Sequence, residues 1–290
     1  MILVDMNQLT ISHIMAESKG KPLINENLIR HMILNNIRLI RNKYKAQYGE
    51  IVLCYDSMHN WRREIFPNYK ARRKKNREKS EIDWNSLHNI MDKIREELIA
   101  HFPYKVMKID CCEADDIIAI LTRELSSQEP ILILSSDEDF IQLQKYPNVS
   151  QYSLIQKKFL KTNDPKEFVF QHVIDGDSGD DVPNILSEDD CFVTEGKRQV
   201  PLTAKRKNII REEWVKNGFS TVPSKFENSD QITKNIERNT KLIDFDNIPG
   251  RIKEIIITTY NTTIPAKRDG LLNYFIAHGL GNLMDTLTEF

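Results

Sequence analysis

The stretch "EPILILSSDED", residues 129–139, indicates the fold of this chain. Its four consecutive apolar residues, 131–134, show no polar alternation, which is typical of a parallel strand covered on both faces. Asp137 and Asp139 come soon after this strand. Open parallel sheets bind ligands beyond the carboxyl ends of their strands, so these two acids are predicted to lie at the functional edge of the sheet.

Other segments of the first half are predicted to pair with this strand. They are short, largely apolar and bounded by polar residues: 1–5, 50–56 and 104–110, with an edge strand at 148–154. Between them, apolar residues recur at helical spacing, at 33–44, 87–98 and 117–125. This alternation predicts an α/β fold with a mostly parallel central sheet flanked by helices.

The second half is predicted to be helical. Candidate helices lie at 165–175, 203–217, 230–243, 249–259 and 267–278, whereas 184–201 has no clear period and is predicted to be irregular. No Gly/Ser-rich or Pro-rich linker separates the two halves. We therefore predict an α/β core over 1–163 and a C-terminal helical region over 164–290 that packs on the sheet.

Composition places the chain among ordinary globular proteins. It has 290 residues, of which 40% are hydrophobic and 29% charged. No apolar stretch is long enough for a membrane helix, and Asp5 comes too early for a secretory signal, so a cytoplasmic monomer that does not contact membranes is expected. The four cysteines lack zinc-site spacing.

Basic residues are concentrated in one strip. The net charge is −1, but "WRREIFPNYKARRKKNREK", residues 61–79, carries nine Lys/Arg against two Glu, which is +7 and leaves −8 for the rest of the chain. Such an arrangement favours binding of nucleic-acid phosphates. A solvated charged helix or a disordered basic loop is the alternative interpretation.

Acidic residues end the predicted strands. Asp5 and Asp56 close two of them, while Glu113, Asp115 and Asp116 open the helix after a third. Acids in a first helical turn also complement the helix dipole, by about 0.3–1 kcal/mol each. Carboxylates gathered within a few ångströms repel one another unless a cation is present, and oxygen-only ligands favour Mg²⁺ or Mn²⁺ over zinc. A calcium-storage site is the competing interpretation, but the sequence has no EF-hand loop.

On these acids, and on "DGDSGDD" at 175–181, the chain resembles the flap endonuclease family of 5′-nucleases, and within it the ribonuclease H group of T-even phages, over nearly its whole length. The resemblance implies a 5′-nuclease or PIN-like fold and two Mg²⁺ ions, for which Mn²⁺ can substitute. The implied metal ligands are Asp5, Asp56, Glu113, Asp115, Asp116, Asp137, Asp139, Asp177 and Asp180.

The resemblance also implies that the basic strip belongs to a helical arch at 57–82. Tyr69, Lys70 and Arg73 match the family element that reaches the scissile phosphate. Trp61, Phe66 and Tyr69 are predicted to stack on unpaired bases. The predicted phosphate-binding residues of the strip are Arg62, Arg63, Arg72, Lys74, Lys75 and Arg77. Lys205 and Lys207, with Arg206 between them, are predicted to bind the phosphates of the double-stranded part of the substrate. "VPN", residues 182–184, lacks the family's glycine-rich hairpin that grips duplex DNA.

The implied activity is removal of RNA primers and adjacent DNA from the 5′ ends of lagging-strand fragments during phage replication, in the host cytoplasm, by two-metal-ion hydrolysis. The implied substrates are RNA–DNA hybrids, 5′ flaps and forked duplexes, and the implied partners are a phage single-stranded DNA-binding protein and a sliding clamp. A non-catalytic forked-DNA-binding module and a PIN-type single-strand ribonuclease are the alternatives. The tail at 278–290 is predicted to pack against the body of the protein.

Overall fold

The computed structural model describes residues 1–17, 25–217 and 228–290. Contacts divide the chain into two compact units. The first contains Met1–His59, Glu81–Thr162 and Gly250–Phe290, and the second contains Asn60–Ser80 and Asn163–Pro249. The segments 1–163 and 164–290 that were predicted from the sequence therefore each contribute to both units.

The first unit is built on a six-stranded sheet of order β3-β2-β1-β4-β5-β6. Its strands are β1 (Ile2–Asp5), β2 (Ile51–Tyr55), β3 (Lys105–Lys108), β4 (Ile131–Leu134), β5 (Val149–Ser153) and β6 (Lys158–Leu160). β1 to β5 pair in parallel, whereas β6 runs antiparallel to β5. The predicted strands are thus confirmed, and β6 is an addition that the sequence analysis missed.

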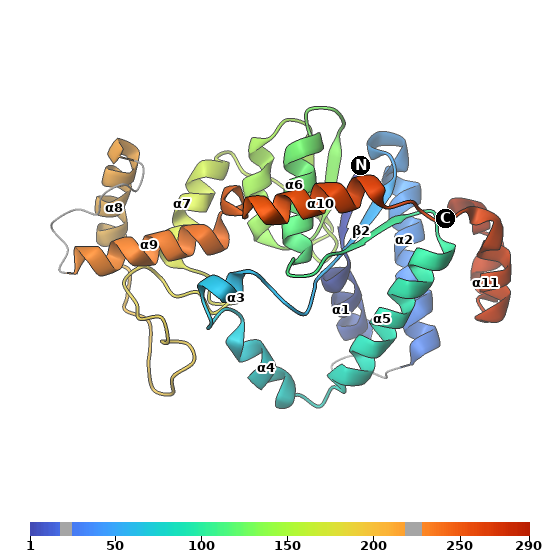
Figure 1. Ribbon diagram of the computed structural model, residues 1–290, viewed down its shortest axis with the longest axis horizontal. Helices are drawn as coiled ribbons and strands as arrows, with labels where there is room; N and C mark the ends of the chain where they lie inside the picture. Colours follow the sequence, from blue (N-terminus) through green and yellow to red (C-terminus); the bar gives the residue numbers. More distant parts are fainter. Residues whose placement is uncertain (18–24, 218–227) are drawn as a thin grey trace. The chain divides into compact units, whose positions relative to one another are not determined.

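The central strands β1, β2 and β4 are buried on both faces, as the unbroken apolar run of β4 predicts. Ile2, Val4 and Leu132 belong to a core that also contains residues of α2 (Glu26–Tyr48) and α5 (Trp84–His101). The intervening Leu3 and Ile133 are buried too. α6 (Ala114–Leu125) contacts β1, β2 and β4, and α10 (Gly250–Thr262) contacts α6 (Figure 1).

Side-chain caps explain where the long helices begin. Asn25 accepts a hydrogen bond from the Leu28 amide at the start of α2, and Asp83 accepts one from the Ser86 amide at the start of α5, both at 3.0 Å. α1 (Met6–Glu17) follows β1 without any intervening loop. Because no breaker or cap separates it from the strand, the sequence analysis did not predict α1.

The C-terminal residues pack on the first unit. α11 (Leu271–Ala277) and α12 (Gly281–Met284), with the short 3₁₀ turns Arg268–Gly270 and Leu287–Glu289, lead to Phe290. The Phe290 side chain is fully buried, with its ring 5.8 Å from that of Phe102 and 5.2 Å from that of Phe275. The predicted packing of the tail at 278–290 is confirmed.

Phe102→Ala is expected to lower the free energy of unfolding by about 3–5 kcal/mol, because Phe102 is fully buried in this aromatic cluster and its removal leaves a cavity. Urea denaturation followed by circular dichroism measures the change. Ile276→Ala is the matched control, since Ile276 is 60% exposed on α11 and its truncation is expected to cost no more than about 0.5 kcal/mol. Equal losses in the two variants would contradict the packing described here.

The second unit is mainly helical. It contains α3 (Arg62–Ile65), α4 (Ala71–Glu78), α7 (Pro165–Asp175), α8 (Ala204–Asn217), α9 (Ser229–Ile243) and the 3₁₀ turn Phe245–Asn247. The predicted helices of this region are confirmed, and 184–201 is irregular as predicted. Its core joins residues of α7 and α9 to Phe66 and Tyr69. No helix in the described parts of either unit is long and apolar enough to span a bilayer.

Candidate metal centre

Asp5 lies at the centre of the sheet's carboxyl edge. It ends β1, which has β2 on one side and β4 on the other, so it stands where the strand order reverses. Its side chain is nearly buried, at 7% exposure. It accepts hydrogen bonds from the Gln8 amide at 3.0 Å and from the Ser135 hydroxyl at 3.2 Å.

The electrostatic surroundings of Asp5 fit a bound cation. Burial, the neighbouring Asp56 and, to a smaller extent, Asp137 raise the pKa of Asp5 to about 7, although the hydrogen bonds from Gln8 and Ser135 oppose this. A carboxyl group whose charged form is disfavoured by other carboxylates gains most when a positive ion enters. The oxygen donors of these three acids suit a hard divalent cation.

Asp56 links the end of β2 to the start of α6. Its carboxylate accepts a hydrogen bond from the Asn7 side chain at 2.6 Å and another from the Ala114 amide, at the first turn of α6, at 2.8 Å. The second bond satisfies one of the amides that every helix start leaves without an intrahelical partner. Asp56 is therefore oriented by two different elements.

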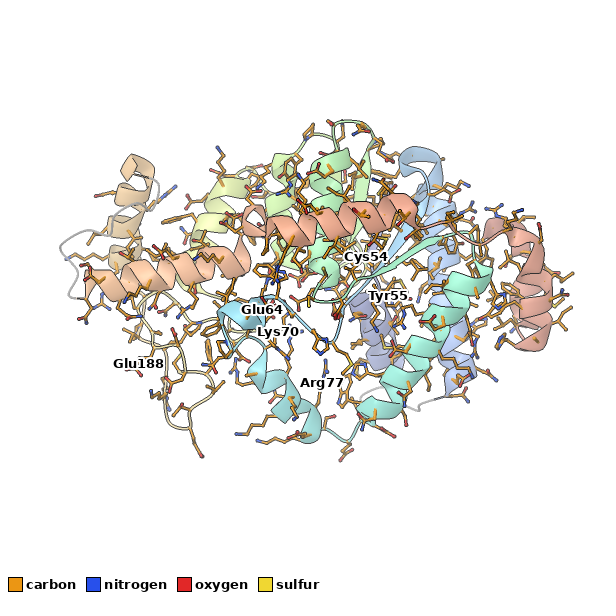
Figure 2. The ribbon with its side chains drawn as sticks, viewed as in Figure 1. Cys54, Tyr55, Glu64, Lys70, Arg77 and Glu188 are labelled. Atoms are coloured by element: carbon orange, nitrogen blue, oxygen red, sulfur yellow. The ribbon has the colours of Figure 1, made fainter. Side chains whose placement is uncertain are left out.

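Glu113 and Asp116 form a capping box at the start of α6. The Glu113 side chain accepts from the Asp116 amide, and the Asp116 carboxylate accepts from the Glu113 amide at 2.9 Å. Asp115 lies on the neighbouring position and is partly exposed. Burial and the charges of Asp5 and Asp115 raise the pKa of the Cys54 thiol, which lies on β2 and is labelled in Figure 2.

Asp137 and Asp139 open the 3₁₀ helix η1 (Glu138–Lys145). The Asp137 side chain accepts from the Asp139 amide at 3.0 Å, while the Gln151 side chain donates to the Asp137 carbonyl oxygen at 2.6 Å. The Gln8 side chain accepts from the Ser136 amide at 2.5 Å. These bonds fix the turn after β4 and so hold both carboxylates at the edge of the sheet.

In the second unit, a tight turn carries Asp177 and Asp180. Gly176 adopts a positive φ of 69°, and a Cβ atom there would meet the Val182 carbonyl oxygen at 2.4 Å. The Asp177 carboxylate accepts from the Gly179 amide at 2.7 Å. Glycine is therefore required before Asp177, which gives a physical reason for the Gly-Asp pair in the sequence.

Asp180 binds the three residues that were predicted to reach the scissile phosphate. The Tyr69 hydroxyl donates to its carboxylate at 2.7 Å, Arg73 donates at 2.6 Å, and the Lys70 Nζ lies 3.3 Å away. Tyr69 is buried in the core of the second unit, so it is not available to stack on a base. Lys70, which Figure 2 labels, and Arg73 are partly exposed at the start of α4.

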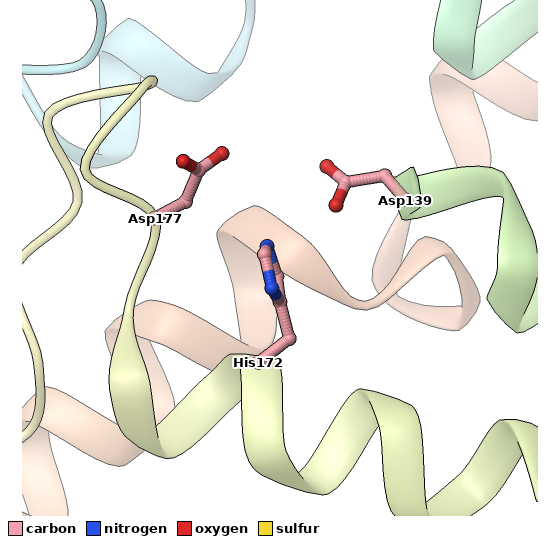
Figure 3. A group of neighbouring side chains, drawn as sticks. All are labelled: Asp139, His172 and Asp177. Carbon is pink, nitrogen blue, oxygen red and sulfur yellow. The ribbon is translucent and has the colours of Figure 1, made fainter. Parts of the chain in front are cut away.

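His172 was missed by the sequence analysis. It lies on α7 and is directed towards the loop that bears Asp177, and a ring nitrogen of His172 and a carboxylate oxygen of Asp177 lie within 4.8 Å of each other (Figure 3). The imidazole stacks on Phe168 at 5.6 Å. Its position five residues before Asp177, on the preceding helix, was the available signal.

The basic residues fall into two groups. Lys74, Lys75 and Arg77 are exposed on α4, as a phosphate-binding surface requires, and Arg63 is exposed on α3. By contrast, Arg62 is buried and donates to the Leu242 carbonyl oxygen at 2.9 Å.

Burial also bears on the aromatic residues of the basic strip and on Arg62. Trp61, Phe66 and Arg62 are all buried, so neither ring is exposed for base stacking in this structure, and phosphate binding by Arg62 stays a prediction. Charge and aromaticity can be read from the sequence, but burial depends on the fold.

The predicted duplex-binding lysines lie on α8. Lys207 forms an ion pair with Asp175 at 2.6 Å. Lys205 lines an open groove of about 1200 Å³ together with Arg206 and residues of α9. Their binding of duplex DNA stays a prediction.

Asp5→Asn is expected to stabilise the metal-free protein at pH 8. Below pH 4 the Asp5 carboxyl is protonated in both the folded and the unfolded state, but between pH 4 and 7 only the folded state retains the proton, so stability falls as the pH rises. The free-energy cost of ionising Asp5 in the folded protein reaches at most about 4 kcal/mol above pH 7. The asparagine side chain does not ionise and therefore avoids this cost. Urea denaturation with EDTA at pH 4.5 and at pH 8 measures the difference.

Asp110→Asn is the control for this prediction. Hydrogen bonds from His59 and Ser57 lower the pKa of the exposed Asp110, so its substitution is not expected to stabilise the protein at pH 8. If Asp5→Asn stabilised the protein equally at both pH values, the gain could not come from the ionisation of Asp5.

The chain matches two protein families. Residues 1–172 match the family described as 5′-3′ exonuclease, N-terminal resolvase-like domain, and residues 165–290 match the family described as T4 RNase H, C terminal. The ribonuclease H of Enterobacteria phage T4 is 34% identical over 99% of this chain and 95% of its own length. A 5′-3′ exonuclease of Buchnera aphidicola from Schizaphis graminum is 30% identical over 53% of each chain.

Two solved structures from bacteriophage T5 share the fold. A bacteriophage T5 flap endonuclease, in a pseudo-enzyme-product complex with DNA and metal ions, has a TM-score of 0.66 and 20% identity and covers 90% of this chain and 96% of its own. A T5 5′-exonuclease with bound zinc has a TM-score of 0.63 and 18% identity, and covers 91% of this chain and 99% of its own. This likeness confirms the predicted 5′-nuclease fold.

Proposed function

The chain belongs to the 5′-3′ exonuclease family, with a carboxyl-terminal part of the T4 ribonuclease H type, and from this membership we propose that it removes RNA primers and short 5′ DNA flaps from lagging-strand fragments. It is a nuclease that hydrolyses phosphodiester bonds. RNA–DNA hybrids, 5′ flaps and forked duplexes are the proposed substrates. A single-stranded DNA-binding protein and a sliding clamp are the proposed protein partners.

The observation that carries the proposal is the crowding of Asp5, Asp56 and Asp137 at one edge of the sheet, which raises the pKa of Asp5 to about 7. We propose that they hold Mg²⁺, with Mn²⁺ as a substitute. Divalent ions bound there would activate a water molecule and stabilise charge on the phosphate oxygens. Asp139 and the acids of α6 would orient these ligands or their water, while Asp177 and Asp180 stay predicted ligands on the family pattern.

The cationic residues at the start of α4 have a separate role in this proposal. Lys70 and Arg73 offset negative charge that builds up on the phosphate as the bond breaks, and Lys74, Lys75 and Arg77 hold the nucleic-acid backbone. The Asp180 carboxylate keeps Lys70 and Arg73 together. No side chain needs to form a covalent intermediate.

A substrate panel tests the proposal. The intact protein is incubated with 5′-labelled RNA–DNA hybrid, 5′-flap duplex, forked DNA duplex and single-stranded RNA in Mg²⁺, and the products are separated by length. Short labelled products from the hybrid and the flap are expected. Cleavage of single-stranded RNA alone would instead indicate a PIN-type ribonuclease, and tight binding of the fork without cleavage would indicate a non-catalytic module.

A further inference from the structure

The helix α4 cannot be stable through its own sequence. Its eight residues, ARRKKNRE, include none that is buried, and five of them carry positive charge. Helices this short are marginal in water even when their composition is favourable, and repulsion between neighbouring cations weakens them further. The residue before its first turn, Lys70, provides no side-chain cap and adopts a positive φ of 54°. Something outside the helix must therefore hold its first turn.

Asp181 supplies that support. Its carboxylate accepts a hydrogen bond from the Arg72 amide at 2.7 Å, which is the bond that a capping residue makes to the second residue of a helix. The same carboxylate forms an ion pair with the Arg72 guanidinium, so one acid holds both the backbone and the side chain. Asp181 is 1% exposed. Burial strengthens its ion pair with Arg72, and an unpaired carboxylate at this buried position would destabilise the protein.

Further contacts fix the same junction within the second unit. The Arg72 guanidinium donates to the Ser178 carbonyl oxygen and lies 4.5 Å from the centre of the Phe192 ring. The Lys70 amide donates to the Asp180 carbonyl oxygen at 2.8 Å. Asp181 itself has a positive φ of 61°, a conformation that costs free energy and persists only where surrounding contacts hold it. The first turn of α4 is thus bound to the Asp177–Asp181 loop through both main chain and side chains.

We propose that Asp181 and Arg72 are positioning residues that cap α4 and hold Lys70 and Arg73 at the Asp180 carboxylate. This assignment rests on the proposed function, in which Lys70 and Arg73 act on the phosphate. It differs from the sequence prediction, in which Arg72 contacts the phosphate itself. The two roles give different kinetics, because a positioning residue affects the maximal rate whereas a phosphate contact affects binding and its salt dependence.

The experiment uses the full chain with Arg72→Ala, Asp181→Asn and the double variant, and Lys75→Ala for comparison. Amide hydrogen exchange of 71–78 is measured without substrate, and single-turnover cleavage of a 5′-flap duplex is measured in Mg²⁺ at several salt concentrations. Arg72→Ala and Asp181→Asn are expected to speed exchange in 71–78 and to lower the maximal rate about 10-fold with the salt dependence of binding unchanged. Since the two residues form one pair, the double variant is expected to lose no more than either single variant.

Lys75→Ala is expected to show the opposite behaviour: weaker binding, a salt slope reduced by about 1, and unchanged exchange in 71–78. The proposal is overturned if Arg72→Ala behaves like Lys75→Ala, or if the two single losses add in the double variant. Should Asp181→Asn fail to fold in a thermal melt, Arg72→Ala still decides, since the Arg72 side chain is 38% exposed. If the wild type cleaves no 5′ substrate, the proposed function fails, while the exchange data still test the anchoring of α4.

Discussion

Asp137→Asn is expected to lower the single-turnover rate of 5′-flap cleavage in Mg²⁺ by about 10²–10³-fold, while the protein stays folded. Asp137 is one of the acids that raise the pKa of Asp5. The neutral side chain of an asparagine at this position would no longer balance the positive charge of a divalent ion. The main-chain carbonyl oxygen of residue 137 still accepts from Gln151 in this variant, and the side-chain oxygen of asparagine can still accept the capping bond from the Asp139 amide. The variant therefore removes charge with little change in shape.

Glu138→Gln is the matched control for Asp137→Asn. Glu138 lies between the two predicted ligands but is exposed, and no role in metal binding is proposed for it. Its cleavage rate is expected to equal that of the wild type. A loss of activity in Glu138→Gln as large as in Asp137→Asn would mean that net charge at this edge, rather than ligation, governs the rate.

Arg73→Ala is expected to have the second largest effect, a loss of about 10²-fold or more in the single-turnover rate with a smaller change in substrate affinity. Arg73 is 48% exposed although it forms an ion pair with Asp180, so an incoming phosphate can reach its guanidinium. Transition-state stabilisation predicts a loss in the maximal rate rather than in binding alone. Rapid-quench cleavage over a range of enzyme concentrations separates the two quantities.

Lys79→Ala serves as the control for Arg73→Ala. It removes one positive charge from the other end of α4, where Lys79 is exposed. Its maximal rate is expected to be unchanged. If Arg73→Ala weakened binding without slowing the bound substrate, Arg73 would be a phosphate contact and not a part of the reaction chemistry.

Local patterns predicted much of the first unit because the signals lie within a few residues of each other. The apolar run at 131–134 is sufficient to define β4, and the spacing of apolar residues at 117–125 defines most of α6. The elements that were missed have weak local signals. β6 (Lys158–Leu160) has a largely polar context and exists through its pairing with β5, and α1 follows β1 without a break.

The acids at the carboxyl ends of the strands could be grouped from the sequence because parallel topology brings those ends together. The partners of the basic strip could not be predicted in the same way. Arg72 and Asp181 are 109 residues apart, and their contact depends on how the second unit folds. Arg62 is equally cationic in the sequence, but its contact with the Leu242 carbonyl oxygen buries it. Long-range packing, rather than residue type, decides which of these cations is exposed.

We infer that carboxylates at the edge of the sheet hold divalent ions for 5′ cleavage of nucleic acid. The most direct test is to incubate a 5′-labelled flap duplex with the wild-type protein in Mg²⁺, in Mn²⁺ and in EDTA, and to measure the length of the labelled product. Short 5′ products that appear in Mg²⁺ and are absent in EDTA are the expected result. Tight binding of the duplex with no cleavage in either Mg²⁺ or Mn²⁺ would contradict the account.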